Sequence, residues 1–205
     1  MIATDIERAL PIMKDPKGLR TFINSIHELP EDSYQSFLGI MEEMEFPKGK
    51  LLTREGEIEQ YIYFVLEGAQ RMYHMKNGKE HVIHLTYHPA FTGIPESFLA
   101  QIPSYCYLEC LTDSRFLRFS RESLDELMVQ DHHMERFVRK ATTEVLVGIV
   151  ERYYGLMSLP MKERFIKIMK GNANLLQLVP QKHIASYLNM DPTNFSKLLG
   201  TTKIG

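Results

Sequence analysis

Between residues 50 and 87 the sequence alternates short apolar segments with tight turns, and this pattern restricts the fold more than any other feature. Four segments rich in Ile, Val, Leu, Tyr and Phe follow one another, with Asn77-Gly78 between the last two. Asn-Gly favours a two-residue hairpin because both turn positions need a positive φ. Short strands at this spacing predict a sandwich or jelly-roll barrel. The predicted strands are residues 50–53, 60–67, 70–75, 79–87, 105–111 and 115–119.

Helical periods flank the predicted barrel on both sides, so the fold class is α+β. Residues 4–46 are predicted to form short helices punctuated by prolines, with Ile40, Met41 and Met44 at helical spacing. Ser120 suits a helix N-cap, and a helical period then continues to about Leu159 with a predicted break at 130–132. We expect a barrel domain at 1–130, a long helix at 131–159 and a helical domain at 160–205.

The long helix carries two apolar stripes. Met134, Ala141, Val145 and Gly148 form one, and Leu146, Ile149, Val150 and Tyr153 form the other. Two stripes indicate two partners. We expect the barrel to cover one and the same helix of a second subunit to cover the other, which predicts a homodimer through residues 131–159. The alternative is an intramolecular partner, for which the remaining C-terminal segment is small.

A helix-turn-helix is predicted at PQKHIASYLNMDPTNFSKLLG, residues 180–200. Asn189 tolerates the left-handed conformation that a tight turn between helices requires. Asp191 suits an N-cap and Pro192 the first helical position, so a second helix starts there and Gly200 ends it. The small, turn and apolar residues occur in the order typical of this motif. They are Ala185, Asn189, Met190, Phe195 and Leu198.

The outward residues of this motif are suited to double-stranded DNA. On the second helix they are polar or basic and can reach base edges or phosphates, and those at the start of the first helix can reach the DNA backbone. Residues 160–205 carry seven Lys and Arg against two acids, a net charge of +5, within a chain of net charge −2. A helical hairpin without a DNA role is the alternative. The predicted DNA-binding residues are Gln181, Lys182, Thr193, Asn194, Ser196 and Lys197.

In this order of parts the chain resembles the Crp/Fnr family of bacterial transcription regulators. The resemblance rests on FPKGKLLTREGE (46–57), IYFVLEGAQRMYH (62–74), NGKEHVIHL (77–85), LTDSRFLRFSRESLDELM (111–128) and IASYLNMDPTNFSKLL (184–199). The SFL and PSY segments at 97–105 are most similar to a branch common in Bacteroidetes. The resemblance implies a cyclic-nucleotide-binding-like sensor barrel, a dimer helix and a winged helix-turn-helix that inserts residues 192–199 of each subunit into successive major grooves.

The sequence departs from the family pattern at the DNA reader. The family's acidic and arginine reading positions fall on Thr193 and Lys197, and lysine lacks the bidentate fork of arginine. The family half-site therefore does not transfer. Because the sequence given stops at Gly205, we expect a reduced wing and fewer phosphate contacts.

The family's ligand loop falls on residues 91–105 but lacks its charges. The ribose-binding pair would fall on Gly93-Ile94, or on Glu96 after a shift, the phosphate-binding pair on Ser104-Tyr105, and the adenine-facing pair on Ile149-Val150. A buried phosphate needs a cation or many donors, yet residues 90–114 contain no Lys or Arg. We expect a barrel filled by side chains or one that takes an apolar or neutral ligand, with Arg71 and Arg118 as the remaining candidate cations. The candidate pocket residues are Gly93, Glu96, Ser97, Ser104, Tyr105 and Ile149.

Other function classes find little support in the sequence. We find no nucleophile–base pair, metal triad or phosphate-gripping loop, so we expect no enzyme, no metal and no cofactor. Cys106 and Cys110 are too far apart on one strand to bridge. No signal peptide or membrane span is evident, which predicts a cytoplasmic protein. The leading hypothesis is a dimeric transcription regulator that cyclic AMP does not gate. The alternative is a sensor of small molecules, cyclic nucleotides included, or an interaction module with weak or lost DNA binding.

Overall fold

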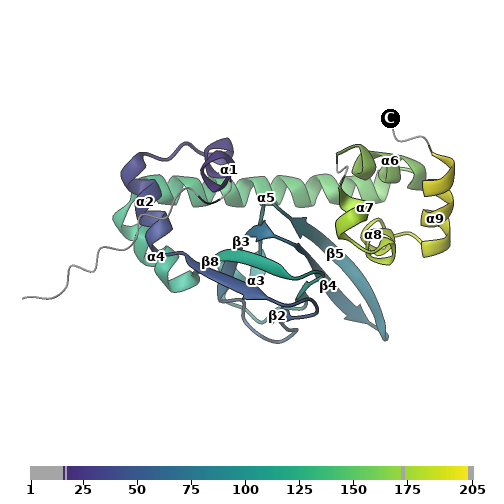
Figure 1. The fold of residues 1–205 in the computed structure, drawn as a ribbon, viewed down its shortest axis with the longest axis horizontal. Helices are drawn as coiled ribbons and strands as arrows, with labels where there is room; N and C mark the ends of the chain where they lie inside the picture. Colours follow the sequence, from purple (N-terminus) through teal and green to yellow (C-terminus); the bar gives the residue numbers. More distant parts are fainter. Residues whose placement is uncertain (1–15, 17, 172–173, 203–205) are drawn as a thin grey trace, which may run out of the picture.

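Two antiparallel four-stranded sheets form a jelly-roll barrel at the centre of the molecule, as a computed structural model that describes residues 16, 18–171 and 174–202 shows (Figure 1). One sheet has the order β1-β8-β3-β6 and the other β2-β7-β4-β5. The strands are β1 (Glu42–Phe46), β2 (Leu51–Thr53), β3 (Tyr61–Glu67), β4 (Ala69–Lys76), β5 (Lys79–Tyr87), β6 (Phe91–Thr92), β7 (Tyr107–Cys110) and β8 (Ser114–Ser120). The predicted jelly roll is therefore confirmed.

The turn chemistry and the two-residue period explain the barrel. Asn77 and Gly78 have φ values of 51° and 72°, as the predicted hairpin between β4 and β5 requires. Alternate residues of β3, Tyr63 and Val65 among them, point into the barrel because side chains alternate between the faces of a strand. The interior cluster consists of Tyr63, Val65, Ile94, Cys106, Leu108, Cys110 and Phe116.

The first part of the barrel corrects one prediction. Residues 42–46 form strand β1 and not a helix, so the helical prediction for 4–46 is wrong beyond Gly39, and residues 4–15 lie outside the described part. Strand β1 pairs with β8 in register Glu42↔Arg118. Opposite charges on facing strands stabilise the pairing: Arg118 contacts Glu42 at 2.9 Å, and Arg115 forms ion pairs with Glu43 and Glu45.

Four helices close one end of the barrel around a second core cluster. They are α1 (Leu19–Ile26), α2 (Glu31–Gly39), α4 (Arg121–Gln130) and the first turns of α5 (His132–Ser158). The predicted cap is present, since the Ser120 side chain accepts a hydrogen bond from the amide of Ser123. Asp131 caps α5 in the same way and separates it from α4, at the predicted break.

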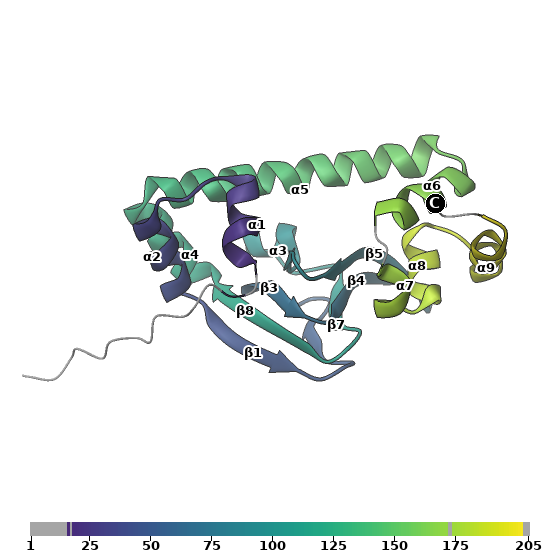
Figure 2. The same ribbon diagram turned by 45° about the horizontal axis from the view of Figure 1, so that its top comes forward.

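Helix α5 runs along the whole molecule but packs on the barrel only at its start (Figures 1 and 2). Met134 and Phe137 are buried, whereas every residue from Thr142 to Glu151 is exposed. The barrel therefore covers only the beginning of the first predicted stripe. None of the described helices is long and apolar enough to span a membrane.

The C-terminal helices form a small domain that rests on the β2-β7-β4-β5 sheet. They are α6 (Met161–Gly171), α7 (Leu175–Leu178), α8 (Gln181–Tyr187) and α9 (Pro192–Thr201). One apolar cluster joins Phe165, Ile184 and Phe195 of these helices to Ala69 and Leu111 of the barrel. Helix α7 was not predicted, and α9 continues one residue past Gly200. The expected wing would lie beyond the described residues.

The turn between β3 and β4 requires glycine. Gly68 has a φ of 94°, and a Cβ there would lie 2.7 Å from the Asp113 carbonyl oxygen and would collide with the Ser114 hydroxyl. We expect Gly68→Ala to lower the free energy of unfolding by about 2–4 kcal/mol in urea titrations. Gly56→Ala, at a φ of 85° with open space around it, should cost only about 1 kcal/mol. Equal losses at both positions would contradict the packing argument.

Candidate nucleic-acid interface and the loop element at residues 91–105

Helices α8 and α9 form a tight helix-turn-helix whose turn follows the sequence prediction. Asn189 has a φ of 51°, and the amide of Met190 donates to the Ala185 carbonyl at 2.9 Å. The Asp191 carboxylate caps α9 by accepting from the Thr193 amide at 2.8 Å. This hydrogen bond lowers the pKa of Asp191, so the cap stays ionised at neutral pH.

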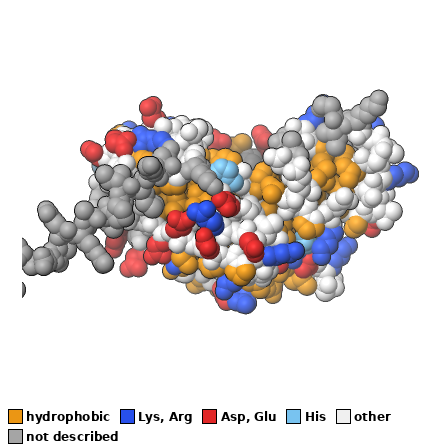
Figure 3. All heavy atoms as spheres, viewed as in Figure 1, with side chains coloured by type: hydrophobic (Ala, Val, Ile, Leu, Met, Phe, Trp, Pro, Cys, Tyr) orange, Lys and Arg blue, Asp and Glu red, His pale blue; other side chains and the backbone are white. Residues whose placement is uncertain are grey.

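The outer surface of α9 is polar and basic. Phe195 is fully buried in the domain core, as predicted, while the predicted DNA-binding residues of α9 are exposed. All six predicted DNA-binding residues are exposed: Gln181, Lys182, Thr193, Asn194, Ser196 and Lys197. Figure 3 shows Lys and Arg side chains over the right-hand end, where these helices lie, and a predominance of Asp and Glu at the left-hand end.

The C-terminal domain of helices α6–α9 is fixed to the barrel by a buried arginine, which the sequence suggested only as a candidate cation for the barrel pocket. Arg71 of β4 is only 5% exposed. Its guanidinium donates to Glu109 of β7 at 2.8 Å and to Glu80 of β5 at 3.0 Å. The same guanidinium lies 2.9 Å from Nδ1 of His183 on α8. One side chain therefore joins three strands to the first helix of the helix-turn-helix.

This contact requires a neutral His183. Burial and then the charge of Arg71 lower the pKa of His183 to about 4, so at neutral pH its Nδ1 accepts a hydrogen bond from the guanidinium. Ser186 adds a second contact one turn later, because its hydroxyl accepts from the Val82 amide at 3.0 Å. Helix α8 thus contacts the Arg71 side chain of β4 and the backbone of edge strand β5.

The loop element at residues 91–105 is tightly packed. It contains β6 and the short helix α3 (Pro95–Ala100), with Ile94 and Phe98 buried in two different clusters. A Cβ at Gly93 would collide with Ile62, so the glycine permits close packing. Ser97 is fully buried; its hydroxyl accepts from the Glu59 amide at 2.9 Å and donates to the Ile102 carbonyl at 2.6 Å. Glu96 is exposed to solvent.

Glu59 is a buried carboxylate that the sequence reasoning missed. It is 1% exposed and accepts from the Thr53 hydroxyl at 2.7 Å and from the Tyr61 amide at 3.2 Å. Burial raises its pKa, while hydrogen bonds from Thr53 and from the amides of Tyr61 and Ile94 oppose that rise. The signal was in the sequence: Glu59 has the same parity as Tyr61, Tyr63 and Val65, and so points into the barrel.

The remaining candidate pocket residues do not converge on one cavity. Ser104 is buried, and its hydroxyl accepts from the Cys106 amide and donates to the Cys106 carbonyl. Tyr105 is 71% exposed, and Ile149 is exposed on α5. The two candidate cations are already paired, Arg71 as described and Arg118 with Glu42 and over the ring of Tyr61.

The cysteines and histidines form no obvious reactive site in the described part of the chain. Cys106 and Cys110 are buried thiols, and burial raises the pKa of each to about 11, so both are protonated at neutral pH. Within residues 16, 18–171 and 174–202, no three His, Cys, Asp or Glu side chains group as metal ligands would.

The barrel is similar in sequence to a known domain family. Residues 43–131 match the family model of the cyclic nucleotide-binding domain. The barrel of this chain has the fold of that domain. A sequence search of the curated proteins finds no match.

Solved structures share the fold over most of the chain. FixK2 from Bradyrhizobium japonicum is 18% identical over 78% of this chain and 83% of its own, with a TM-score of 0.68. The global regulator CLP from Xanthomonas campestris, described as responsive to c-di-GMP, is 15% identical over 83% and 90%, with a TM-score of 0.61. The catabolite activator protein from Thermus thermophilus is 17% identical over 85% and 84%, with a TM-score of 0.56.

Because burial raises the pKa of Glu59 above its unfolded value, the folded state takes up a proton more readily than the unfolded state. Stability from this group is therefore gained as the pH falls from 7 towards 5. We expect the wild type to gain stability relative to Glu59→Gln over this range, measured by urea unfolding at each pH. Glu55→Gln, an exposed change in the preceding turn, should show no such trend. If the difference in unfolding free energy between the wild type and Glu59→Gln did not change with pH, the raised pKa of Glu59 would be contradicted.

Proposed function

We propose that this protein is a DNA-binding transcription regulator of the Crp/Fnr type, which acts as a homodimer and is not gated by cyclic AMP. The observation that carries the proposal is the reader helix α9. Its cap and its buried Phe195 fix the helix on the domain, while Thr193, Asn194, Ser196 and Lys197 are presented to solvent. Four polar or basic side chains on one exposed helix suit base edges and phosphates of the major groove.

A homodimer along α5 is supported by the apolar residues that this chain leaves uncovered. Leu146, Val150, Tyr153 and Met157 are spaced by four, three and four residues and are 60%, 39%, 60% and 71% exposed. That spacing makes one continuous seam, as in a coiled coil. Large apolar side chains so exposed on a helix are typical of a helix–helix interface. A second copy of α5 would cover the seam and set two α9 helices side by side.

Independence from cyclic AMP is supported by the loop element. From residue 90 to 114 it has no cation, and Glu59 already accepts hydrogen bonds from the neighbouring backbone. A buried cyclic phosphate would then lie near a carboxylate without a cation to offset its desolvation. CLP and the catabolite activator protein share the fold and have a regulator's or activator's name. Their effectors do not transfer at this identity.

DNA binding can be tested by selecting bound fragments from a library of genomic DNA and measuring affinity for the enriched site at several salt concentrations. We expect Lys197→Met to weaken binding about tenfold or more and to reduce the magnitude of the salt slope by about one per lost phosphate contact. Arg136→Met, at the far end of α5, serves as the matched control and should bind normally. Cyclic AMP should change neither affinity. No enriched palindrome would favour a module without DNA binding.

The dimer can be tested by sedimentation of the full chain. Leu146→Glu would place a carboxylate in each half of the proposed seam, and we expect the variant to sediment as a monomer with an intact fold. Glu144→Lys changes charge on the opposite side of the same helix and should leave the dimer in place. A dimeric Leu146→Glu variant would place the interface elsewhere.

A further inference from the structure

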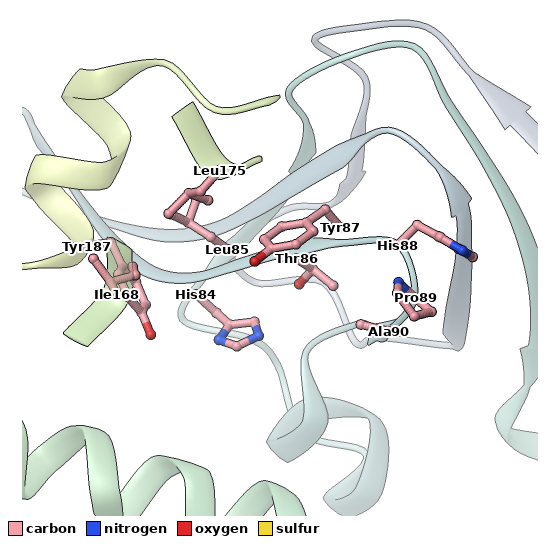
Figure 4. A pocket seen from close by; sticks show the side chains of 10 residues that line it. All are labelled: His84, Leu85, Thr86, Tyr87, His88, Pro89, Ala90, Ile168, Leu175 and Tyr187. Atoms are coloured by element: carbon pink, nitrogen blue, oxygen red, sulfur yellow. The ribbon is translucent and has the colours of Figure 1, made fainter. Parts of the chain in front are cut away.

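A cavity lies outside the barrel interior, between the end of β5 and the C-terminal domain of helices α6–α9. Its volume is about 340 Å³, within the range of small-molecule sites. Figure 4 shows Ile168 and Tyr187 of the C-terminal helices on one side and His84 and Tyr87 of β5 nearby. The cavity is lined by His84, Leu85, Thr86, Tyr87, His88, Pro89, Ala90, Ile168, Leu175 and Tyr187. The wall is mostly apolar and aromatic, with His84, Thr86 and His88 as its polar members, and none of these residues is acidic.

A half-buried arginine stands beside the cavity. The Arg152 guanidinium, on α5, lies 3.8 Å from the ring centroid of Tyr187 and donates to the Tyr187 carbonyl at 2.8 Å. From the side of the long helix, Arg152 thus contacts Tyr187, one of the residues that line the cavity.

This guanidinium has no carboxylate partner in the described part of the chain. Burial lowers the pKa of Arg152, and the neighbouring Arg164 adds to that effect. The Arg164 guanidinium likewise forms no ion pair within the described residues and donates to the Leu156 carbonyl. The Arg152 guanidinium contacts the lining residue Tyr187 and forms no ion pair within the described residues, so it can pair with an anion bound in the cavity.

We propose that this cavity binds an aromatic carboxylate, with its ring against Tyr87, Tyr187 and Leu85 and its carboxylate on Arg152. The aromatic and aliphatic wall suits a flat apolar body. The ligand would touch the barrel, α5 and the C-terminal domain at once, so its binding would favour one position of helix α9.

The proposal can be tested by calorimetry and fluorescence with 2-naphthoate as the probe. The chain contains no tryptophan, so naphthalene emission has no tryptophan background. We expect saturable binding of 2-naphthoate, and binding at least about tenfold weaker for its neutral analogue 2-naphthalenemethanol and its cationic analogue 2-naphthylmethylamine, because only the carboxylate can pair with Arg152.

Variants separate the charge from the cavity. Arg152→Met should weaken 2-naphthoate binding about tenfold and abolish the preference over the alcohol, whereas Arg152→Lys should retain much of it. Arg136→Met, an exposed change on the same helix, is the control and should bind as the wild type does. Ala90→Phe, which fills the cavity, should block all three probes.

Circular dichroism confirms that each variant is folded before its binding is compared. Two results would overturn the proposal: no binding of 2-naphthoate by the wild type, or equal affinity for the acid and the alcohol. Unchanged binding by Arg152→Met would also overturn it. Because these measurements need no DNA, their failure is distinguishable from failure of the proposed regulator function.

Discussion

The arrangement of the two domains depends on the guanidinium of Arg71. A buried charge of this kind is tolerated only when its donors are matched, and here two carboxylates and a neutral imidazole accept them. Glu109 and Glu80 belong to the strands on either side of β4, so the Arg71 guanidinium links three neighbouring strands of the sheet. His183 joins the C-terminal domain to this network of charged side chains in the sheet. The position of α9 follows from this contact and from the shared apolar cluster behind it.

Much of this architecture could be predicted because it depends on short sequence patterns that determine turns and helix caps. The Asn77-Gly78 turn, the Ser120 and Asp191 caps and the left-handed Asn189 each depend on the residue and its neighbours alone. The helical prediction at 42–46 failed because strand pairing with β8, through Glu42 and Arg118, overrides a weak helical period. The docking of α8 could not be predicted, because it joins residues more than a hundred positions apart, as Arg71 and His183 show.

The loop element at residues 91–105 was only partly predictable. The buried Glu59 beside it was not predicted from the sequence. The sequence shows that residues 90–114 contain no Lys or Arg. It does not show that the neighbouring hydrogen-bond donors bind the carboxylate of Glu59. The Glu59 carboxylate accepts hydrogen bonds from the Thr53 hydroxyl and the Tyr61 amide, so these donors already have an acceptor within the chain. The cavity at the end of β5 lies instead where the barrel meets the helices, with a guanidinium and no carboxylate. In this chain the favourable place for an anion is therefore at the domain boundary.

Strand β5 lies at the edge of its sheet, and α8 is what covers that edge. An uncovered edge strand presents unpaired amides and carbonyls that pair readily with another chain. If the C-terminal domain moved away from β5, the Val82 amide would lose its partner and the apolar residues Leu85 and Tyr87 would meet water. The uncovered edge of β5 could then pair with the same strand of another copy. The docked arrangement therefore covers an edge strand as well as fixing the position of α9.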